Sequence, residues 1–129
     1  MDRQHSKLIL VIDDNEENVD IIVNKLHHVG YEVISAEDGE GGVELARGRN
    51  PGLILLDIML PKMDGWEVLE QLKSHEQTKD IPVIFMTAYT TIHFEGERRR
   101  AIDSGATDYL KKPFELQKLA ELVGRHLPL

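Results

Sequence analysis

Five polar side chains stand where apolar runs of the sequence end, and together they could carry out metal-assisted phosphoryl chemistry. They are Asp13, Asp14, Asp57, Thr87 and Lys112. Three carboxylates meeting in one crevice repel each other and raise at least one pKa, a penalty that a divalent cation removes. The ligands are all oxygens, with no histidine or cysteine at matched spacing, so Mg²⁺, Mn²⁺ or Ca²⁺ suit them. Mg²⁺ fits best, because it keeps several waters and completes its shell with a phosphate.

The other members of this set predict what the metal would be used for. A lysine and a hydroxyl opposite the metal can hold the oxygens of a phosphoryl group in its transition state. A carboxylate in that setting can act as a nucleophile and form an aspartyl phosphate. Each residue alone has a plainer interpretation, since an aspartate after a strand commonly caps a helix or begins a loop. The convergence of all five at strand ends favours function.

The elements that must position these residues follow from the apolar pattern. Short apolar runs predict strands over 7–12, 31–36, 51–57, 82–87 and 108–112. Helical spacing predicts helices between the cap Asn15 and Gly30, over 38–48, after the cap Asp64, over 97–104, and after the cap Glu115. A polar loop is predicted over 89–96, before a helix anchored chiefly by Ala101 and Ile102. Inward-facing positions are predicted for Val68, Leu69 and Leu72, and for Leu116, Leu119, Ala120, Val123 and Leu127.

Five alternations of strand and helix predict an α/β fold with a parallel sheet covered by helices on both faces. The 129 residues are half of what a (β/α)₈ barrel needs, so a single doubly wound five-stranded sheet is predicted. Its first and third strands should be neighbours where the winding reverses, which brings Asp13, Asp14 and Asp57 into one crevice.

Composition excludes several classes of protein. The chain has no cysteine, which rules out disulfides and thiol catalysis and fits a reducing compartment. The net charge of −8 argues against a fold-wide nucleic-acid footprint. No apolar stretch is long enough to span a bilayer. A cytoplasmic domain is therefore expected.

The order and spacing of four motifs resemble the receiver domain of two-component response regulators, similar to the chemotaxis response regulator. The motifs are VIDDN at 11–15, LDIMLPKMDG at 56–65, MTA at 86–88 and DYLKKPF at 108–114. The resemblance covers residues 7–127 and implies one receiver domain over 1–129. It also implies the flavodoxin-like strand order 2-1-3-4-5.

The resemblance implies a role for each acidic residue. Asp57 would be the phosphoacceptor. Asp14 would hold Mg²⁺ directly, Asp13 directly or through water, and the backbone carbonyl of Met59 would complete the protein ligands together with Asp57. Gly65 would shape the loop beside the site. Mn²⁺ is the alternative ion.

The resemblance also assigns the residues that respond to phosphorylation. Thr87 would hydrogen-bond a phosphoryl oxygen. Lys112, and not Lys111, would pair with the phosphoryl group, because it directly precedes Pro113. The peptide between Lys112 and Pro113 would be cis. Tyr109 would turn inward when Thr87 is drawn to the phosphate; the alternative is that Tyr109 is simply an exposed strand residue.

The function implied is that of a signalling switch rather than an enzyme, with only self-phosphorylation and self-dephosphorylation as chemistry. A histidine kinase or histidine phosphotransfer protein would donate the phosphoryl group. The change would reach a downstream protein through a surface made by the fourth helix, fifth strand and fifth helix. No direct nucleic-acid or membrane contact is expected, and the chain would be a monomer or a weak phosphorylation-dependent dimer.

Two alternatives come from other classes. A Mg²⁺-dependent phosphohydrolase with an aspartate nucleophile would need an acid two residues after Asp57, where this chain has Met59. An interaction domain that works without phosphorylation usually lacks the acidic residues, which are present here.

Overall fold

Five parallel strands form one sheet in the order β2-β1-β3-β4-β5, which confirms the predicted fold class. The computed structural model describes residues 6–87 and 94–129, with the backbone alone for residues 94, 95, 97 and 98. The strands are β1 (Leu8–Ile12), β2 (Glu32–Ala36), β3 (Leu53–Asp57), β4 (Val83–Thr87) and β5 (Asp108–Lys111). Four of these strands begin one or two residues later than predicted, and β5 begins at the predicted residue. Lys112, the last residue of the fifth predicted strand, lies just beyond β5.

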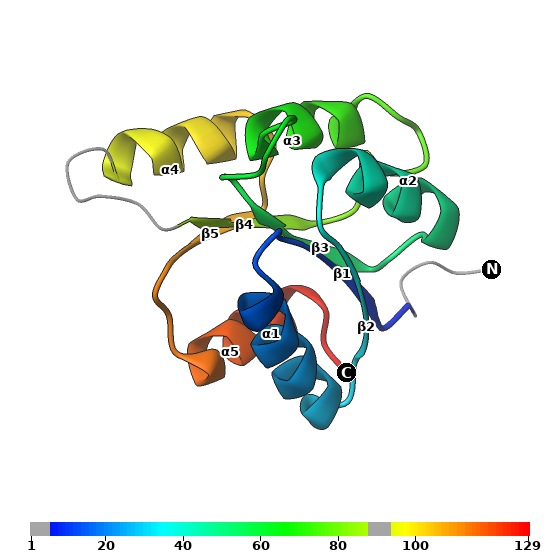
Figure 1. The fold of residues 1–129 in the computed structure, drawn as a ribbon, viewed down its shortest axis with the longest axis vertical. Coiled ribbons are helices and arrows are strands. Elements are labelled where there is room, and N and C mark those ends of the chain that lie inside the picture. Colours follow the sequence, from blue (N-terminus) through cyan, green and yellow to red (C-terminus); the bar gives the residue numbers. More distant parts are fainter. Residues whose placement is uncertain (1–5, 88–93) are drawn as a thin grey trace.

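Helices cover both faces of the sheet, as the alternating pattern predicts. They are α1 (Glu16–Val29), α2 (Gly39–Arg49), α3 (Gly65–Lys73), α4 (Phe94–Asp103) and α5 (Leu116–His126). One face carries α1 and α5, and the other carries α2, α3 and α4 (Figure 1). Among the residues the structure describes, no helix has the length and apolar character needed to cross a membrane.

The central strands are buried along their whole length because helices pack on both of their faces. Every residue of β1, β3 and β4 is buried, whereas the edge strand β2 is partly exposed. Alternate residues of the same strand therefore enter two separate cores. Phe85 lies in the core below α2, α3 and α4, and Ile84 in the core below α1 and α5.

Polar caps fix where the helices begin beside the site. The side chain of Asn15 accepts a hydrogen bond from Asn18 N at the start of α1. At α3, Asp64 and Glu67 form a reciprocal capping box, which satisfies two backbone N–H groups. Glu115 stands at the cap position of α5 as predicted, but its side chain makes no cap hydrogen bond.

Helix α5 buries one face against the sheet, largely as predicted. Leu119, Val123 and Leu127 are buried, whereas Leu116 and Ala120 are half-buried. The prediction omitted Leu122, which is also buried.

The predicted start of α4 and one of its two anchors are wrong. The helix begins at Phe94 rather than Glu97 and runs through Gly96. One glycine costs a helix only about 1 kcal/mol, so Gly96 does not prevent the helix from starting earlier. Residues 89–93 of the predicted loop lie outside the described part of the chain. Ala101 is fully buried as predicted, but Ile102 is 44% exposed. Ile102 therefore does not anchor α4 to the core as Ala101 does.

Gly65 is required by the close approach of α3 to the end of β3. Its N–H donates to Ile58 O at 2.8 Å. A Cβ at this position would stand 2.7 Å from Asp57 O and 2.6 Å from Ile58 Cα. These contacts involve backbone atoms, which cannot rotate away.

Replacing Gly65 by alanine should therefore lower the free energy of unfolding by about 1–3 kcal/mol, the usual range for overpacking. Urea denaturation measures the change. Gly48→Ala is the matched control, because no heavy atom beyond its own helix backbone and chain neighbours lies within 4 Å of its added Cβ. That helical substitution should leave stability unchanged or raise it by up to about 1 kcal/mol. Equal effects of the two variants would contradict the steric argument.

Candidate functional site

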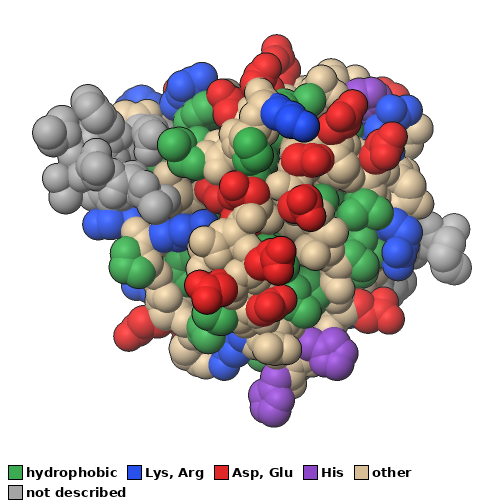
Figure 2. All heavy atoms as spheres, in the orientation of Figure 1, with side chains coloured by type: hydrophobic (Ala, Val, Ile, Leu, Met, Phe, Trp, Pro, Cys, Tyr) green, Lys and Arg blue, Asp and Glu red, His purple; other side chains and the backbone are tan. Residues whose placement is uncertain are grey.

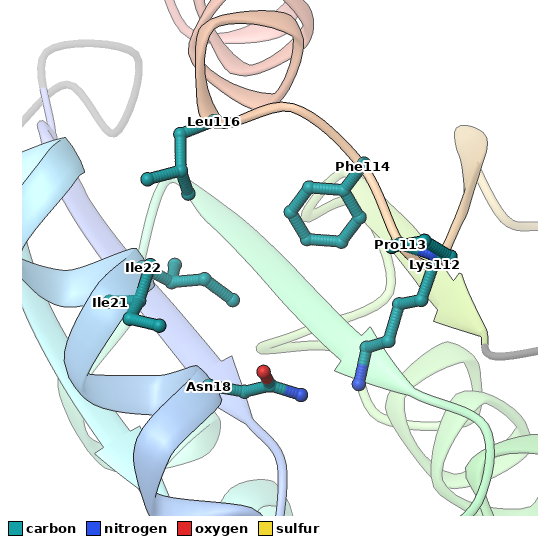
Figure 3. A pocket seen from close by; sticks show the side chains of 7 residues that line it. All are labelled: Asn18, Ile21, Ile22, Lys112, Pro113, Phe114 and Leu116. Atoms are coloured by element: carbon teal, nitrogen blue, oxygen red, sulfur yellow. The ribbon is translucent and has the colours of Figure 1, made fainter.

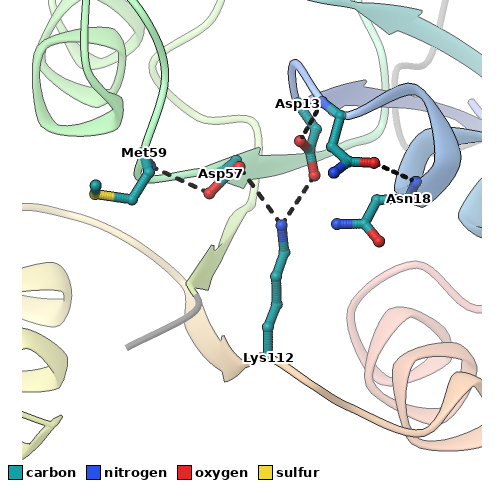
Figure 4. A network of polar contacts seen from close by, with 6 residues as sticks. Asp13, Asn18, Asp57, Met59 and Lys112 are labelled. Atoms are coloured by element: carbon teal, nitrogen blue, oxygen red, sulfur yellow. Dashed lines mark hydrogen bonds and ion pairs between the residues drawn. The ribbon is translucent and has the colours of Figure 1, made fainter. Parts of the chain in front are cut away.

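The carboxyl ends of four strands meet at one edge of the sheet, beside the point where the winding reverses. Asp13 and Asp14 follow β1, Asp57 ends β3, and Thr87 ends β4. Lys112 directly follows β5, where its N–H donates to Thr87 O. Because β3 lies between β1 and β4, Asp57 occupies the centre of this group. Figure 4 shows Asp13, Asp57 and Lys112 pointing toward one another. The five predicted residues are thus brought to one edge.

The three carboxylates form one compact cluster. One ligand oxygen from each of Asp13, Asp14 and Asp57 lies within 4.8 Å of the others. Asp13 is 1% exposed and Asp57 6% exposed, whereas Asp14 lies at the surface. A set of oxygen donors with one open side fits a hard divalent cation that keeps part of its water shell, as Mg²⁺ does. Acidic side chains gather across the middle of this face of the molecule (Figure 2).

Lys112 neutralises part of the charge of this cluster. Its Nζ lies 3.0 Å from Asp13 Oδ2 and 3.4 Å from Asp57 Oδ2. The neighbouring Lys111 is exposed. Successive strand residues point to opposite faces, and Lys112, the lysine that the resemblance implied, is the one seen to contact Asp13 and Asp57. The peptide between Lys112 and Pro113 is cis, also as implied.

Backbone amides orient the two buried carboxylates, a feature the sequence analysis missed. Asn15 N–H donates to Asp13 Oδ1 at 2.9 Å, and Met59 N–H donates to Asp57 Oδ1 at 3.1 Å. In each case the donor lies two residues after the aspartate, the Asx-turn pattern that this residue type favours. The Oδ1 atoms are thereby fixed, and both Oδ2 atoms face Lys112.

Burial raises the pKa of Asp57 from 3.8 to about 6. The charge of Lys112 opposes this rise, the nearby Asp13 carboxylate adds to it, and the Met59 N–H hydrogen bond opposes it. Burial therefore outweighs the favourable contacts of the ionised form. Keeping Asp57 ionised in the folded protein costs free energy, and a bound cation would relieve that cost.

This raised pKa predicts a pH-dependent cost to folding in the metal-free protein. The folded protein binds the Asp57 proton more tightly than the unfolded chain, so the cost is full above about pH 6 and disappears as the pH falls toward 4. With a chelator present, Asp57→Asn should raise the unfolding free energy by about 2–3 kcal/mol at about pH 8. The gain should shrink at about pH 5.

Urea denaturation of the parent and variant at both pH values tests this expectation. Asp20→Asn serves as control because Asp20 is an exposed acid on the neighbouring turn of α1; it should change stability by less than about 0.5 kcal/mol. A larger gain from Asp57→Asn at the lower pH would show that the sign is wrong.

The remaining predicted residues differ in how they face the site. Thr87 is 2% exposed. Tyr109 is 8% exposed and packs in the same core as Phe85, so it is not an exposed strand residue. In this structure its ring already lies inside. The Met59 side chain is 70% exposed, and only its backbone N–H contacts Asp57. The roles of Thr87, Tyr109 and the Met59 carbonyl stay predictions.

An apolar groove adjoins the site and was also missed from the sequence. It lies between α1 and the segment that joins β5 to α5, and Lys112 lines its inner end (Figure 3). Ile21, on the rim, is 49% exposed. A signal was available, since Ile21 stands outside the helical spacing that Val19, Ile22, Val23 and Leu26 follow. The other lining residues are Asn18, Ile22, Pro113, Phe114 and Leu116.

Comparison with known proteins decides the family. Residues 9–124 match the response regulator receiver domain. The chain belongs to this family. This receiver domain is 34% identical over 122 residues to the polar-differentiation response regulator DivK of Brucella ovis, covering 95% of the chain and 97% of DivK. It is 43% identical over 111 residues to the DNA-binding dual master transcriptional regulator RpaA of Synechocystis, covering 86% of the chain and 45% of RpaA. The receiver domain spans about half the length of the first curated relatives it matches.

Solved structures give the same assignment. A putative response regulator from Chloroflexus aurantiacus superposes with a TM-score of 0.86 and 30% identity, covering 96% of this receiver domain and 99% of that chain. The receiver domain of the sensor histidine kinase PA1611 from Pseudomonas aeruginosa superposes with a TM-score of 0.84 and 30% identity, with the same two coverages. The PA1611 structure is described with a magnesium ion coordinated in its active-site cleft.

Proposed function

We propose that this chain is a single receiver domain that accepts a phosphoryl group on Asp57 from a histidine kinase or a histidine phosphotransfer protein. The observation that carries the proposal is the position of Asp57. It is a buried carboxylate within 4.8 Å of two others and 3.4 Å from the Lys112 ammonium. A nucleophile, a cation-binding acidic pair and an anion-binding amine thus lie together at one edge of the sheet. These are the parts that phosphoryl transfer to a carboxylate needs.

Each side chain has a defined task in this transfer. Asp13, Asp14, Asp57 and the Met59 carbonyl would hold Mg²⁺, with Mn²⁺ as the alternative. When bound, the ion neutralises negative charge on the phosphoryl oxygens. Asp57 Oδ1 is held by the Met59 N–H, which leaves Oδ2 as the attacking atom. The new bond joins Oδ2 to phosphorus, while the bond from phosphorus to the donor nitrogen breaks and its electron pair stays on the donor.

Lys112 and Thr87 act on the phosphoryl oxygens. The Lys112 ammonium contacts Oδ2 of both Asp13 and Asp57 before transfer. Its charge is therefore in place for the phosphoryl group that adds to Oδ2. Thr87 ends the neighbouring strand β4, and its hydroxyl would donate to another phosphoryl oxygen.

The groove beside Lys112 fits the phosphodonor protein. It has a volume of about 420 Å³ and opens at the same end of the sheet as the acidic cluster. Exposed Ile21 at its rim gives a partner an apolar contact. A donor that rests on this groove can present its phosphorylated histidine to Asp57.

The proposed output surface comprises α4, β5 and α5, where phosphorylation would change the contacts of a downstream protein. The domain acts as a switch whose only chemistry is its own phosphorylation and dephosphorylation. We place it in the cytoplasm, as a monomer or a weak phosphorylation-dependent dimer, without membrane contact. Direct nucleic-acid contact is not expected of this domain, although relatives such as RpaA are named as DNA-binding.

Incubation with a small phosphodonor such as acetyl phosphate and Mg²⁺, followed by mass spectrometry, tests the proposal. One acyl phosphate per chain is expected. Continuous turnover of the donor without a labelled protein would favour a phosphohydrolase. No labelling and no turnover would favour an interaction domain that does not depend on phosphorylation.

A further inference from the structure

The only tryptophan of the chain links α4 to the core below the phosphoacceptor site. Trp66 lies in the first turn of α3 and is half-buried. Its ring packs edge-on against Phe85, with 4.9 Å between the ring centroids and 60° between the planes. The guanidinium carbon of Arg100 in α4 lies over the same ring, 4.0 Å from the Trp66 centroid. This distance and position define a cation–π contact.

The inner end of this contact lies beside the residues expected to respond to phosphorylation. Phe85 is fully buried in β4 and is paired in register with Tyr109 of β5. Thr87 is two residues further along β4, so it points to the same face of the sheet as Phe85. The Arg100–Trp66 stack therefore packs on the strand residue that is register partner of Tyr109 and shares a sheet face with Thr87.

The outer end of this contact sets the position of α4. Ala101, the residue after Arg100, is fully buried in the same core as Phe85 and Tyr109. Ile102 is exposed. The Arg100–Trp66 stack thus holds against α3 the part of α4 that contributes Ala101 to the core containing Phe85 and Tyr109.

We infer that Arg100 and Trp66 are positioning residues that couple α4 to the phosphoacceptor site. The inference rests on the proposed function. The stack and the buried Tyr109 ring occur together in one structure: Trp66 packs on Phe85, and Tyr109 lies in the same core as Phe85. Under the proposed function, a conformation with Thr87 drawn to a phosphoryl group would also need Tyr109 inside. The stack therefore stabilises the same arrangement that phosphorylation selects, and the two must favour each other reciprocally.

Titration with beryllofluoride, a phosphoryl mimic, in the presence of Mg²⁺ tests this coupling by fluorine NMR. Arg100→Ala should raise the dissociation constant about two- to fivefold, the factor expected from a partly exposed cation–π contact. Trp66→Leu should raise it at least as much. The double variant should bind no more weakly than Trp66→Leu alone, because the contact is already lost. Trp66→Phe, which keeps a ring, should recover part of the affinity.

Arg99→Ala is the matched control, since it removes the same charge from an exposed position of the same helix. It should bind beryllofluoride like the parent. The unfolding free energy of each variant, measured with and without the mimic, distinguishes coupling to the site from a purely structural role. If Arg100→Ala lowers stability equally with and without the mimic, so that its affinity equals that of the parent, the inference is overturned. Failure of the parent chain itself to bind the mimic would overturn the proposed function, and the inference with it.

Discussion

Replacing Asp57 by asparagine is expected to abolish phosphorylation of this receiver domain while leaving it folded. The amide keeps the shape of the side chain and can still accept the Met59 N–H bond at Oδ1. It removes the carboxylate Oδ2, the atom that faces Lys112 at 3.4 Å and is proposed to attack phosphorus. An amide nitrogen in that place has no lone pair comparable to that of a carboxylate, so labelling should fall to background.

Mass spectrometry after treatment with acetyl phosphate and Mg²⁺ measures this result. Asp20→Asn is the control, because Asp20 is an exposed acid near the cluster but outside it. The control should be labelled to the same extent as the parent. Stoichiometric acyl phosphate on the Asp57→Asn variant would remove Asp57 from the role of phosphoacceptor. Circular dichroism of the variant separates loss of function from loss of fold.

The fold could be predicted because the sequence signals are simple and mutually consistent. The runs 8–12, 53–57 and 83–87 are almost wholly apolar, which is the pattern of strands buried on both faces. Parallel strands need crossovers, and the helical spacing between the runs supplies them. Once the strand order is fixed, the ends of β1 and β3 are neighbours. The meeting of Asp13 with Asp57 then follows from topology alone.

Features that depend on side-chain packing or on backbone geometry could not be predicted in the same way. Whether Tyr109 lies inside depends on the space beside Phe85, which is a property of the assembled core. The stack of Arg100 on Trp66 joins two helices far apart in sequence, and no local pattern marks it. The start of α4 was misjudged because Gly96 was taken as a loop residue, although a helix can include one glycine.

The site itself shows the same division. Residue types and strand ends indicated which groups meet, but not how each carboxylate is held. The N–H groups of Asn15 and Met59 fix one oxygen of Asp13 and of Asp57. These bonds come from the turn after each strand, where the backbone rather than the side chain is the donor. Any residue other than proline could supply these N–H groups, so the sequence marks the acceptor aspartates but not the donors.

Asparagine at position 14 should raise the Mg²⁺ concentration needed for half-maximal phosphorylation by about tenfold or more. Asp14 is the surface member of the three-carboxylate cluster, and its loss removes one anionic ligand of an oxygen-only site. Chelating divalent cations should abolish labelling of the parent altogether, since the charge of the phosphoryl group would then face unshielded carboxylates. Phosphorylation with acetyl phosphate across a Mg²⁺ titration gives both values.

Glu37→Gln is the control, because Glu37 is an exposed acid that lines the same pocket as Asp13 and Asp14. Equal Mg²⁺ requirements for the parent and the Asp14→Asn variant would exclude Asp14 as a metal ligand, whereas full labelling with chelator present would exclude the metal from the reaction.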